Sequence, residues 1–212
     1  MRGKYWPDHL KVLHVEIEGV CWLLGHLRPR TQTLVIPAAE GHPSVTLTLY
    51  VEYSSHCVSA GPKQNQVIDF HALGYERLII DHRKVRRVFH AGRHALSFLL
   101  PDIIASIADR RCFFTGRENF LTLELGSVVM PGQTTDMRYE IYFNVRKGEG
   151  KNTLKLFIES AYVRDEDADN RAVNFKKADK IRAWKLFLNT TRGASIKAAR
   201  NSALSMRKKG RV

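Results

Sequence analysis

The sequence predicts an α+β protein, and three patterns support this class. Residues 138–146 and 153–162 both alternate apolar and polar side chains on either side of KGEGKN, a pattern typical of a β-hairpin. Apolar residues between Leu96 and Ile107 recur at helical spacing, which indicates one buried helix face. Short alternating segments fill the first half of the chain. We therefore expect a β-rich N-terminal portion, a central helix, an antiparallel sheet that contains the 138–162 hairpin, and basic C-terminal helices.

The segments of the first half predict several short strands. Residues 11–17 (KVLHVEI) alternate, and Glu18-Gly19 follows as a turn signal, so a strand and a turn are expected there. Further segments of this kind lie between loop signals that contain Pro or Gly. The strands expected in this region are 20–27, 33–36 and 44–53, and the expected loops are 28–29, 41–43 and 59–65.

The middle of the chain combines a basic cluster with a helical pattern. A short apolar run at 77–80 leads into the cluster at 82–94 (HRKVRRVFHAGRH). In the helix that follows, Pro101 and the aspartate after it mark a fresh first turn, so two helical pieces are expected to join at Leu100. Another strand is expected at 119–125.

The positive charge of the chain is concentrated at its C-terminal end. Residues 171–212 hold thirteen Lys and Arg residues against one acidic residue, whereas residues 1–170 hold 21 basic and 20 acidic residues. The acidic segment DEDADN precedes this end, so we expect an α+β body at 1–170 and a basic helical extension at 171–212. The helices expected in the extension are 173–188 and 195–206, with Gly193 between them.

Composition and missing motifs disfavour several protein classes. No apolar run approaches the roughly 20 residues that span a bilayer, and the N-terminal segment has no apolar core of a secretory signal. Three scattered cysteines, Cys21, Cys57 and Cys112, suit a reducing compartment, so a cytoplasmic location is expected. The motifs GxGxxG, GxxxxGK[ST], GxSxG and HExxH are absent, which argues against nucleotide-dependent and zinc-protease chemistry.

Nine histidines raise the question of a metal site. His56 and Cys57 are adjacent, and neighbouring residues of a strand point to opposite faces, so they would not readily share one ion. We expect packed or solvated side chains rather than a structural zinc, and therefore neither a metal nor a cofactor.

A polyanion is the expected partner of the basic extension. Nucleic acid, RNA or DNA, is favoured, while an acidic protein is an alternative; the interrupted apolar face argues against an anionic membrane surface. Six to ten phosphate contacts would weaken binding by about three to five decades between 50 and 200 mM salt. The oligomeric state stays open. The residues expected to contact phosphate are Arg83, Lys84, Arg86, Arg87, Arg93, Lys176, Lys177, Lys180, Arg182, Lys185, Arg192, Lys197, Arg200, Arg207, Lys208 and Lys209.

Two histidines of the basic cluster are candidate catalytic residues. On a helix, His90 and His94 would lie on one face beside the arginines of the cluster. One imidazole could then accept the 2′-hydroxyl proton of RNA, the other could protonate the leaving oxygen, and guanidinium groups could stabilise the charged phosphorane. The alternative is a solvated basic helix face that contacts phosphate without chemistry.

The last strand of the predicted hairpin offers a hydroxyl pair. Ser160 and Tyr162 share one strand face and could orient a phosphate, while Arg146 in the partner strand could neutralise it. The alternative is a hairpin edge whose ends are polar for solubility.

Two segments together resemble a known ribonuclease superfamily. A basic helix ending in an apolar run (HAGRHALSFLLPDII) is followed by strands that close on LKLFIESAYVRD. This order resembles the superfamily of barnase, EndoU, colicin-type and RelE-like ribonucleases across about residues 77–164. The resemblance implies metal-independent RNA cleavage by His90 or His94 with Arg146, Ser160 and Tyr162. The chain is also similar to proteins of bacterial prophages and integrated elements that carry YSxHC and ESAY segments.

These observations lead to three functional hypotheses. The first is a nucleic-acid-binding accessory protein of a mobile element or defence system, and the second is a ribonuclease that acts as a toxin or defence effector. The third is a basic protein that docks on an acidic one. Geometry separates the first two, because convergence of His90, His94, Arg146 and Ser160 around a cleft would favour an enzyme.

Overall fold

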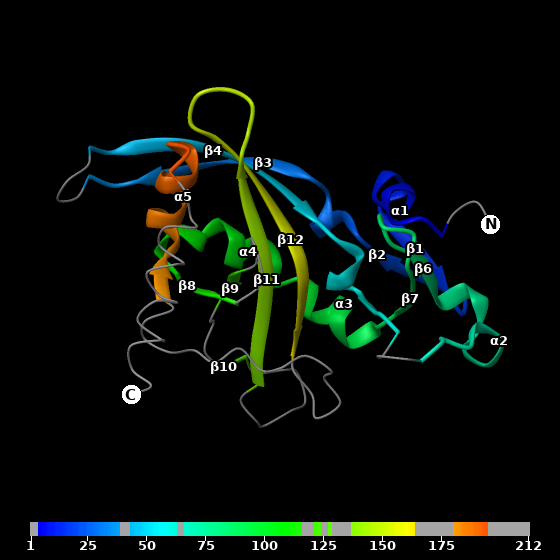
Figure 1. Ribbon diagram of the computed structural model, residues 1–212. Coiled ribbons are helices and arrows are strands. Elements are labelled where there is room, and N and C mark those ends of the chain that lie inside the picture. The colour runs from blue at the N-terminus through cyan, green and yellow to red at the C-terminus, as the bar shows by residue number, and fades with distance from the viewer. Residues whose placement is uncertain are drawn as a thin grey trace, which may run out of the picture.

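The computed structural model describes residues 4–38, 43–62, 66–115, 121–123, 127–128, 137–163 and 180–194 (Figure 1). Helices and mostly antiparallel strands combine in these residues, so the predicted α+β class is confirmed. The long hairpin is also confirmed, as β11 (Met137–Lys147) and β12 (Thr153–Val163).

The main sheet has the strand order β13-β8-β9-β11-β12-β4-β3, with β10 (Ser127–Val128) pairing beside β11. All neighbours in it are antiparallel except β12 and β4, which run parallel. Long strands, β11, β12 and β4, form its centre. The remaining bounds are β3 (Arg30–Ile36), β4 (Val45–Tyr53), β8 (Arg111–Phe114), β9 (Leu121–Leu123) and β13 (Lys180–Arg182).

Two smaller sheets lie at one end of the main sheet, opposite to α5 (Ala183–Thr191) (Figure 1). One is the hairpin of β1 (His14–Ile17) and β2 (Val20–Leu23), and the other has the order β5-β7-β6. The remaining elements here are α1 (Trp6–Val12), η1 (Gly25–Leu27), η2 (Ser55–Cys57), β5 (Ser59–Ala60), α2 (Phe70–Leu73), η3 (Tyr75–Arg77), β6 (Leu78–Ile80) and β7 (Arg86–Phe89).

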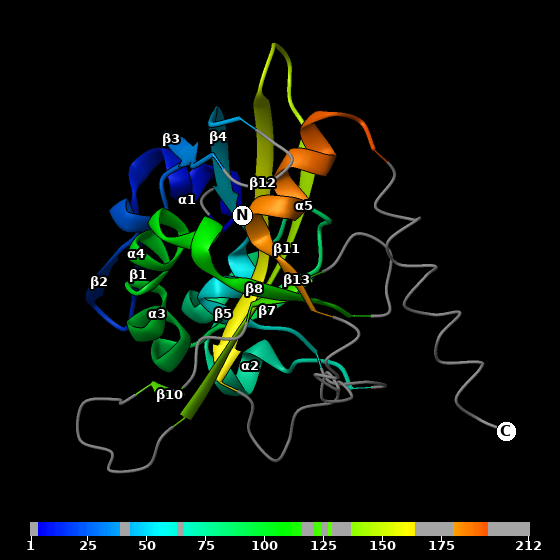
Figure 2. The same ribbon diagram turned by 90° about the vertical axis from the view of Figure 1, so that its left-hand side faces the viewer.

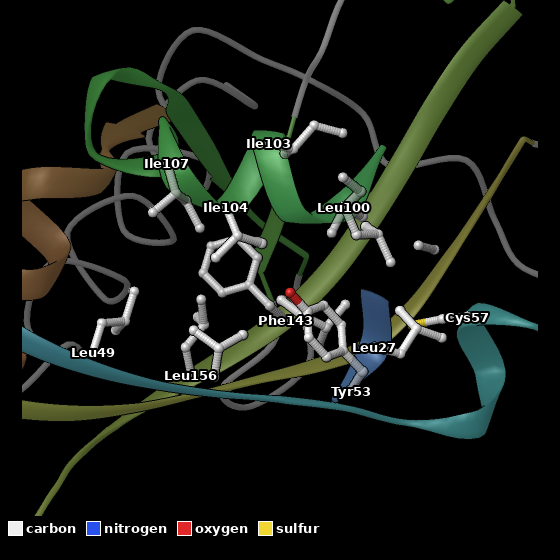
Figure 3. Packing of buried hydrophobic residues seen from close by; sticks show 14 of the residues in the cluster. Leu27, Leu49, Tyr53, Cys57, Leu100, Ile103, Ile104, Ile107, Phe143 and Leu156 are labelled. Atoms are coloured by element: carbon white, nitrogen blue, oxygen red, sulfur yellow. The ribbon is translucent and has the colours of Figure 1, made fainter. Parts of the chain in front are cut away.

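One face of the main sheet is packed against helices. Helices α3 (Ala91–Ser97) and α4 (Leu100–Ala105) lie on one side of the β11–β12 hairpin, with η4 (Ile107–Asp109) after them (Figure 2). Apolar side chains of α4 and η4 meet those of β4, β11 and β12 (Figure 3). The buried set drawn there includes Leu49, Leu100, Ile103, Ile104, Ile107, Phe143 and Leu156. The helical junction predicted at Leu100 is confirmed by the start of α4 at that residue.

A β-bulge interrupts the hairpin near the end of β12. Tyr142 pairs with Ser160, but Phe143 pairs with Ile158, so Glu159 has no partner residue in β11. The bulge shifts the alternation of β12, and Ala161 follows Ile158 as the next apolar core position. Glu159 consequently lies beside the polar residues of β11 rather than in the core.

Three predicted elements are wrong in detail. Residues 11 and 12 close α1 instead of opening a strand, because Pro7 and Asp8 favour a helix start and Leu13 ends it with a left-handed φ of 60°. The expected strand 20–27 stops at Leu23. Within the expected helix at 173–188, residues 180–182 form a strand, and a helix follows from Ala183.

Part of the predicted extension packs on the body. Strand β13 pairs with β8, and α5 buries Ala183, Leu186, Phe187 and Leu188 in the same core as β11 and β12. Gly193 follows the helix with a left-handed φ of 67°, as the predicted break requires. The boundary expected at residue 170 and the helix expected at 195–206 lie outside the described residues.

Candidate functional site

The side chains that alternate with the core positions of β11 and β12 form a face that we call the polar face. It carries Glu140, Tyr142 and Asn144 on β11, and Glu159, Ser160 and Tyr162 on β12. Strand alternation places the first three together, and the bulge adds Glu159 to them. The face therefore gathers titratable and hydrogen-bonding groups at the end of the hairpin that is remote from its turn.

Glu159 is the most perturbed acidic group of this face. It is only 9% exposed, and its Oε1 accepts a 2.8 Å hydrogen bond from Asn144 Nδ2. The Arg83 guanidinium lies 3.9 Å from its Oε2. Burial raises the pKa of Glu159, and the charges of Arg83 and His82 oppose this without cancelling it. Such a carboxyl group exchanges protons closer to neutral pH than an exposed one.

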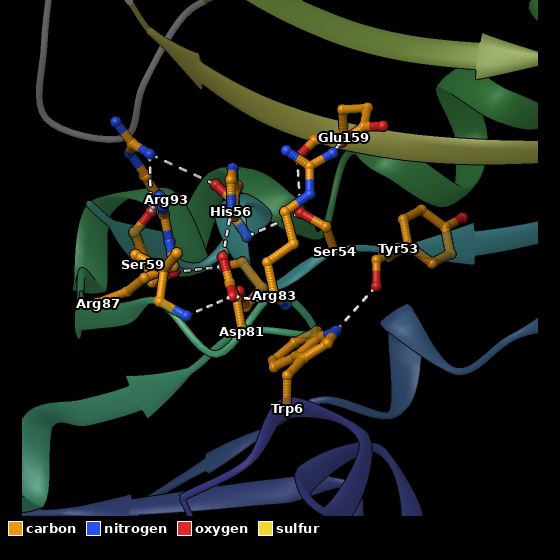
Figure 4. Close-up of polar contacts among 12 residues, drawn as sticks. Trp6, Tyr53, Ser54, His56, Ser59, Asp81, Arg83, Arg87, Arg93 and Glu159 are labelled. Atoms are coloured by element: carbon orange, nitrogen blue, oxygen red, sulfur yellow. Dashed lines mark hydrogen bonds and ion pairs between the residues drawn. The ribbon is translucent and has the colours of Figure 1, made fainter. Parts of the chain in front are cut away.

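The turn that carries Arg83 is held in place by Asp81. Asp81 Oδ1 accepts hydrogen bonds from the backbone N–H groups of Arg83, at 2.8 Å, and Val85, at 2.9 Å. Its Oδ2 accepts from His56 Nε2 at 3.2 Å (Figure 4). Burial acts to raise the pKa of Asp81, but the hydrogen bonds from Val85, His56 and Arg83 outweigh it and lower that pKa. Asp81 thus stays ionised and fixes the turn that carries Arg83.

His56 is a supporting group rather than an acid. Burial and the nearby Arg87 charge lower the pKa of His56 to about 4, although Asp81 acts in the opposite direction. The imidazole is therefore neutral at pH 7 and uses its Nε2–H to orient Asp81.

Two arginines of the basic cluster converge on one serine. Arg87 donates from Nε to Ser59 Oγ at 2.9 Å and from a terminal nitrogen to the Ser59 carbonyl at 3.1 Å. Arg93 donates to the same carbonyl at 2.7 Å, and its guanidinium carbon lies 4.9 Å from the centroid of the Tyr162 ring. Arg87 is 7% exposed, so its guanidinium joins β5 to β7 and faces the interior. Arg93 instead links α3 to the polar face.

An aromatic pair extends the polar face. The rings of Tyr142 and Tyr162 stack with centroids 5.7 Å apart and an interplanar angle of 12°. The Tyr142 hydroxyl donates to Glu140 Oε2 at 2.6 Å, and burial followed by this bond raises the pKa of Tyr142. Tyr142 therefore stays neutral, and it stacks on the buried Tyr162 ring, which lies against the Arg93 guanidinium.

The predicted histidine pair does not share one exposed helix face, because β7 runs to Phe89 and α3 begins only at Ala91. His90 is the N-cap of α3, where its ring nitrogen Nδ1 accepts from the Arg93 backbone N–H at 3.2 Å. His94 is buried, and its Nε2 donates to the Leu23 carbonyl at 2.8 Å. Aromatic rings of Trp22, His26, Phe89 and Phe98 surround it.

The other predicted catalytic residues divide between the two ends of the hairpin. Ser160 and Tyr162 lie on the polar face, on the same side of β12 as predicted. Arg146 is exposed nearer to the turn, opposite Lys155, although its charge still reaches Glu159. The structure thus brings Ser160 and Tyr162 to one face and leaves His94 in the interior.

The predicted phosphate contacts fall into two regions. Arg83 and Lys84 are exposed on the turn between β6 and β7, and Arg86 is exposed at the start of β7; the Lys84 ammonium lies 3.6 Å from the centroid of the Tyr5 ring. At the other end of the sheet, Arg182, Lys185 and Arg192 are exposed around α5, while Lys180 is partly buried beside Phe113. The predicted contacts that lie outside the described residues are Lys176, Lys177, Lys197, Arg200, Arg207, Lys208 and Lys209.

Sequence reasoning missed Glu159, Asn144, Asp81, His56 and His82. The apolar positions of β12 step by two from Leu154 to Ile158 and then by three to Ala161, which was a readable sign of the bulge. No local pattern pointed to the contact between His56 and Asp81, because 25 residues separate them.

Within the described part of the chain, no group of three or more His, Cys, Asp and Glu side chains is arranged to hold a metal ion. Cys57 and Cys112 are buried free thiols, and burial raises the pKa of both to about 12. No helix among these residues is both long and apolar enough to span a membrane.

Fold and site together define an α+β protein with an acid, an amide, tyrosines and arginines gathered on one sheet face. The chain belongs to the YjaZ family, whose family model matches residues 14–191. The match runs from the first residue of β1 to the last residue of α5, so the helix of the predicted extension lies within it. Comparisons with curated proteins and with solved structures find no match.

Proposed function

We propose that this protein binds single-stranded nucleic acid across the polar face. The observation that carries the proposal is an exposed basic turn beside an aromatic sheet face. His82, Arg83 and Lys84 are exposed on the turn, Arg86 is exposed at the start of β7, and Arg83 reaches the polar face at Glu159. Cationic side chains that follow a backbone, next to rings on which bases stack, are the usual means of binding a single strand.

The aromatic side chains favour a single strand over a duplex. Half-buried Tyr142, which stacks on the buried Tyr162, supplies one ring, and the exposed His82 ring lies edge-on to Phe157 with centroids 5.5 Å apart. Bases of a duplex are stacked on each other and cannot use such rings, whereas unpaired bases can. The region around α5 adds cations at the far end of the sheet (Figure 1). A setting in a mobile element or defence system stays a prediction.

A binding titration tests this function. Fluorescence anisotropy with labelled single-stranded RNA, single-stranded DNA and duplex DNA, from 50 to 200 mM salt, should show tighter binding of the single strands and a steep salt dependence. Substitution of Arg83, Lys84 and Arg86 by Ala should weaken binding at least tenfold and flatten the salt slope by about 2 to 3 units. The control removes three exposed cations elsewhere, Arg111, Lys147 and Lys151.

Two results would overturn the proposal. One is the absence of binding to any of the three probes at 50 mM salt, which would leave an acidic protein as the expected polyanion. The other is an equal loss of affinity in the turn variant and the control variant, because the contact would then be non-specific charge attraction.

Metal-independent RNA cleavage is a second candidate, favoured by the raised pKa of Glu159 beside His82 and Arg83. In this scheme the Glu159 carboxylate accepts the proton of the ribose 2′-hydroxyl, whose oxygen attacks the adjacent phosphorus. His82 gives a proton to the departing 5′-oxygen, and Arg83 stabilises the charged phosphorane. The products are a 2′,3′-cyclic phosphate and a free 5′-hydroxyl.

An RNA digestion in the presence of EDTA tests cleavage. The wild-type protein should cleave a labelled single strand between pH 5 and 9, and Glu159→Gln and His82→Ala should each lose at least a hundredfold in rate. His94→Ala is the control, since the folded fraction of that variant should cleave normally. Intact RNA at every pH, with binding retained, would reject the enzyme and leave the binding function.

A further inference from the structure

A cavity of about 440 Å³ adjoins the polar face. Its walls come from α1, the residues just before β3, and the β4–β12 pair, and its apolar lining includes Trp6, Leu10, Pro29 and Phe157. Figure 4 shows Trp6, whose indole N–H donates to the Tyr53 carbonyl at 2.9 Å, in the same view as the polar cluster. The volume falls within the range of small-molecule sites, about 300–1,000 Å³.

Two charged side chains, Glu52 and Arg28, line this cavity. Among the described residues, no partner lies within hydrogen-bond or ion-pair distance of the Glu52 carboxylate or the Arg28 guanidinium. Lys11 also lines the cavity, but its ammonium lies 3.0 Å from Asp8 Oδ1. An apolar cavity lined by a carboxylate and a guanidinium matches a ligand with an apolar body and a polar end of each kind.

The backbone register explains why Glu52 enters this cavity. Glu52 pairs with Phe157 across the parallel β4 and β12 strands, so the two side chains lie on the same face of the sheet. The ring of Phe157 provides a flat apolar surface beside the carboxylate, and His82 closes the cavity on the side of Glu159. A flat ring that lies on Phe157 would therefore present its edge to Glu52.

We propose that this cavity binds a nucleobase, and specifically guanine, as part of a strand bound on the polar face. Guanine alone among the common bases presents two adjacent donors, N1–H and N2–H, which a carboxylate can accept as a pair. Its ring stacks on Phe157, and the attached phosphate binds Arg28. The proposal rests on the proposed function, since it places one base of the bound strand.

His82 connects the base site with the polar face. It lines the cavity, and its charge acts on Glu159. A strand with guanine in the cavity would thus continue past His82 toward Arg83 and Arg93. The site then reads one base, while the basic turn contacts phosphates without reading sequence.

Isothermal titration with mononucleotides tests the base site separately from strand binding. Guanosine 5′-monophosphate should bind at least tenfold tighter than inosine 5′-monophosphate, which lacks the N2 amino group, and tighter than the adenosine and cytidine monophosphates. Glu52→Gln should reduce guanosine monophosphate affinity by about ten- to a hundredfold, because Gln presents one acceptor in place of two. Arg28→Ala should weaken all four nucleotides to a similar extent.

The control variant is Glu16→Gln, which changes an exposed carboxylate of β1 in the same way. Because Glu52→Gln preserves shape, thermal unfolding of both variants should match the wild type. Ribose 5-phosphate that binds as well as guanosine monophosphate, or a Glu52→Gln variant with unchanged affinity, would overturn the base site. Free arginine has a similar pair of donors, so tight arginine binding without guanosine monophosphate binding would also overturn it and indicate a peptide ligand.

The two proposals fail in distinguishable ways. If single strands bind through the basic turn but guanosine monophosphate does not bind, the base site is wrong and nucleic-acid binding stands. If guanosine monophosphate binds through Glu52 but no strand binds, nucleic-acid binding is wrong and the cavity is a site for a free nucleotide.

Discussion

Asn144 Nδ2 donates a 2.8 Å hydrogen bond to Glu159 Oε1, at the point where the register of β11 and β12 shifts. The bulge removes Glu159 from regular pairing, and the amide gives its carboxylate a neutral partner. Burial raises the pKa of Glu159, while the charges of Arg83 and His82 and this hydrogen bond act to lower it without cancelling the effect of burial.

We expect Asn144→Ala to destabilise the protein by about 1–3 kcal/mol at pH 8, because it leaves a buried carboxylate without its donor. The loss should be smaller at pH 4, where the carboxyl group is protonated and needs the donor less. Urea unfolding at both pH values measures the effect. Glu140 and Tyr142 lie on the same face, so Asn144→Asp, which adds a like charge, should cost more than Asn144→Ala at pH 8.

The sign of the Glu159 effect on stability follows from its raised pKa. A group whose pKa is higher in the folded state contributes stability below its unfolded pKa and loses it as the pH rises through the folded value. The stability of the wild type relative to Glu159→Gln should therefore fall from pH 4 to pH 8. Unfolding of Glu149→Gln, at an exposed carboxylate of the hairpin turn, serves as the matched control. If the stability of the wild type relative to Glu159→Gln rose with pH instead, this would contradict the raised pKa of Glu159.

Asp81 should behave in the opposite way. Its pKa is lowered in the folded state, so its contribution to stability is present above the unfolded pKa and is lost as the pH falls through the folded value. Asp81→Ala removes the acceptor of two backbone N–H groups, which costs about 2–4 kcal/mol at pH 7. The difference in unfolding free energy between this variant and the wild type should become smaller below pH 4, as measured by guanidinium unfolding. Asp109→Ala, at an exposed carboxylate, should cost less than about 0.5 kcal/mol.

His90 and His94 should separate stability from nucleic-acid binding. His94→Ala removes a buried ring and its bond to the Leu23 carbonyl, so we expect a loss of about 2–4 kcal/mol with unchanged affinity of the folded protein for RNA. His90→Ala removes the N-cap of α3 and should cost about 1 kcal/mol. Denaturant unfolding and anisotropy titration on the same samples test both. A large loss of affinity in folded His94→Ala would contradict its structural role.

The sequence predicted those features that depend on local periodicity. The hairpin of β11 and β12 and the start of α4 followed from alternation and from Pro101, because these signals act within a few residues. The sequence predicted the site less completely, because the geometry of the site depends on contacts between residues far apart in the chain. Arg87 illustrates this: as a charged residue it was expected on the surface, yet hydrogen bonds to Ser59 keep it inside. Residues 86–89 form a strand rather than a helix because they pair with β5 and β6, and no local sequence pattern reveals this pairing.

The final prediction concerns the C-terminal end, where charge suggested an extension and packing joins α5 to the core. A chain that ends at residue 194 keeps Leu186 and Phe187 in place and should unfold with the same cooperativity as the full chain. A chain that ends at residue 179 loses both, and Phe187→Ala alone should cost about 3–5 kcal/mol, so this shorter chain should be largely unfolded. Circular dichroism and thermal unfolding distinguish the two.

The chain that ends at residue 194 can then show, by the salt slope of RNA binding, whether the cations after residue 194 contact phosphate. A flatter slope with an intact fold would assign those contacts, whereas a stably folded chain ending at 179 would contradict the role of α5 in the core.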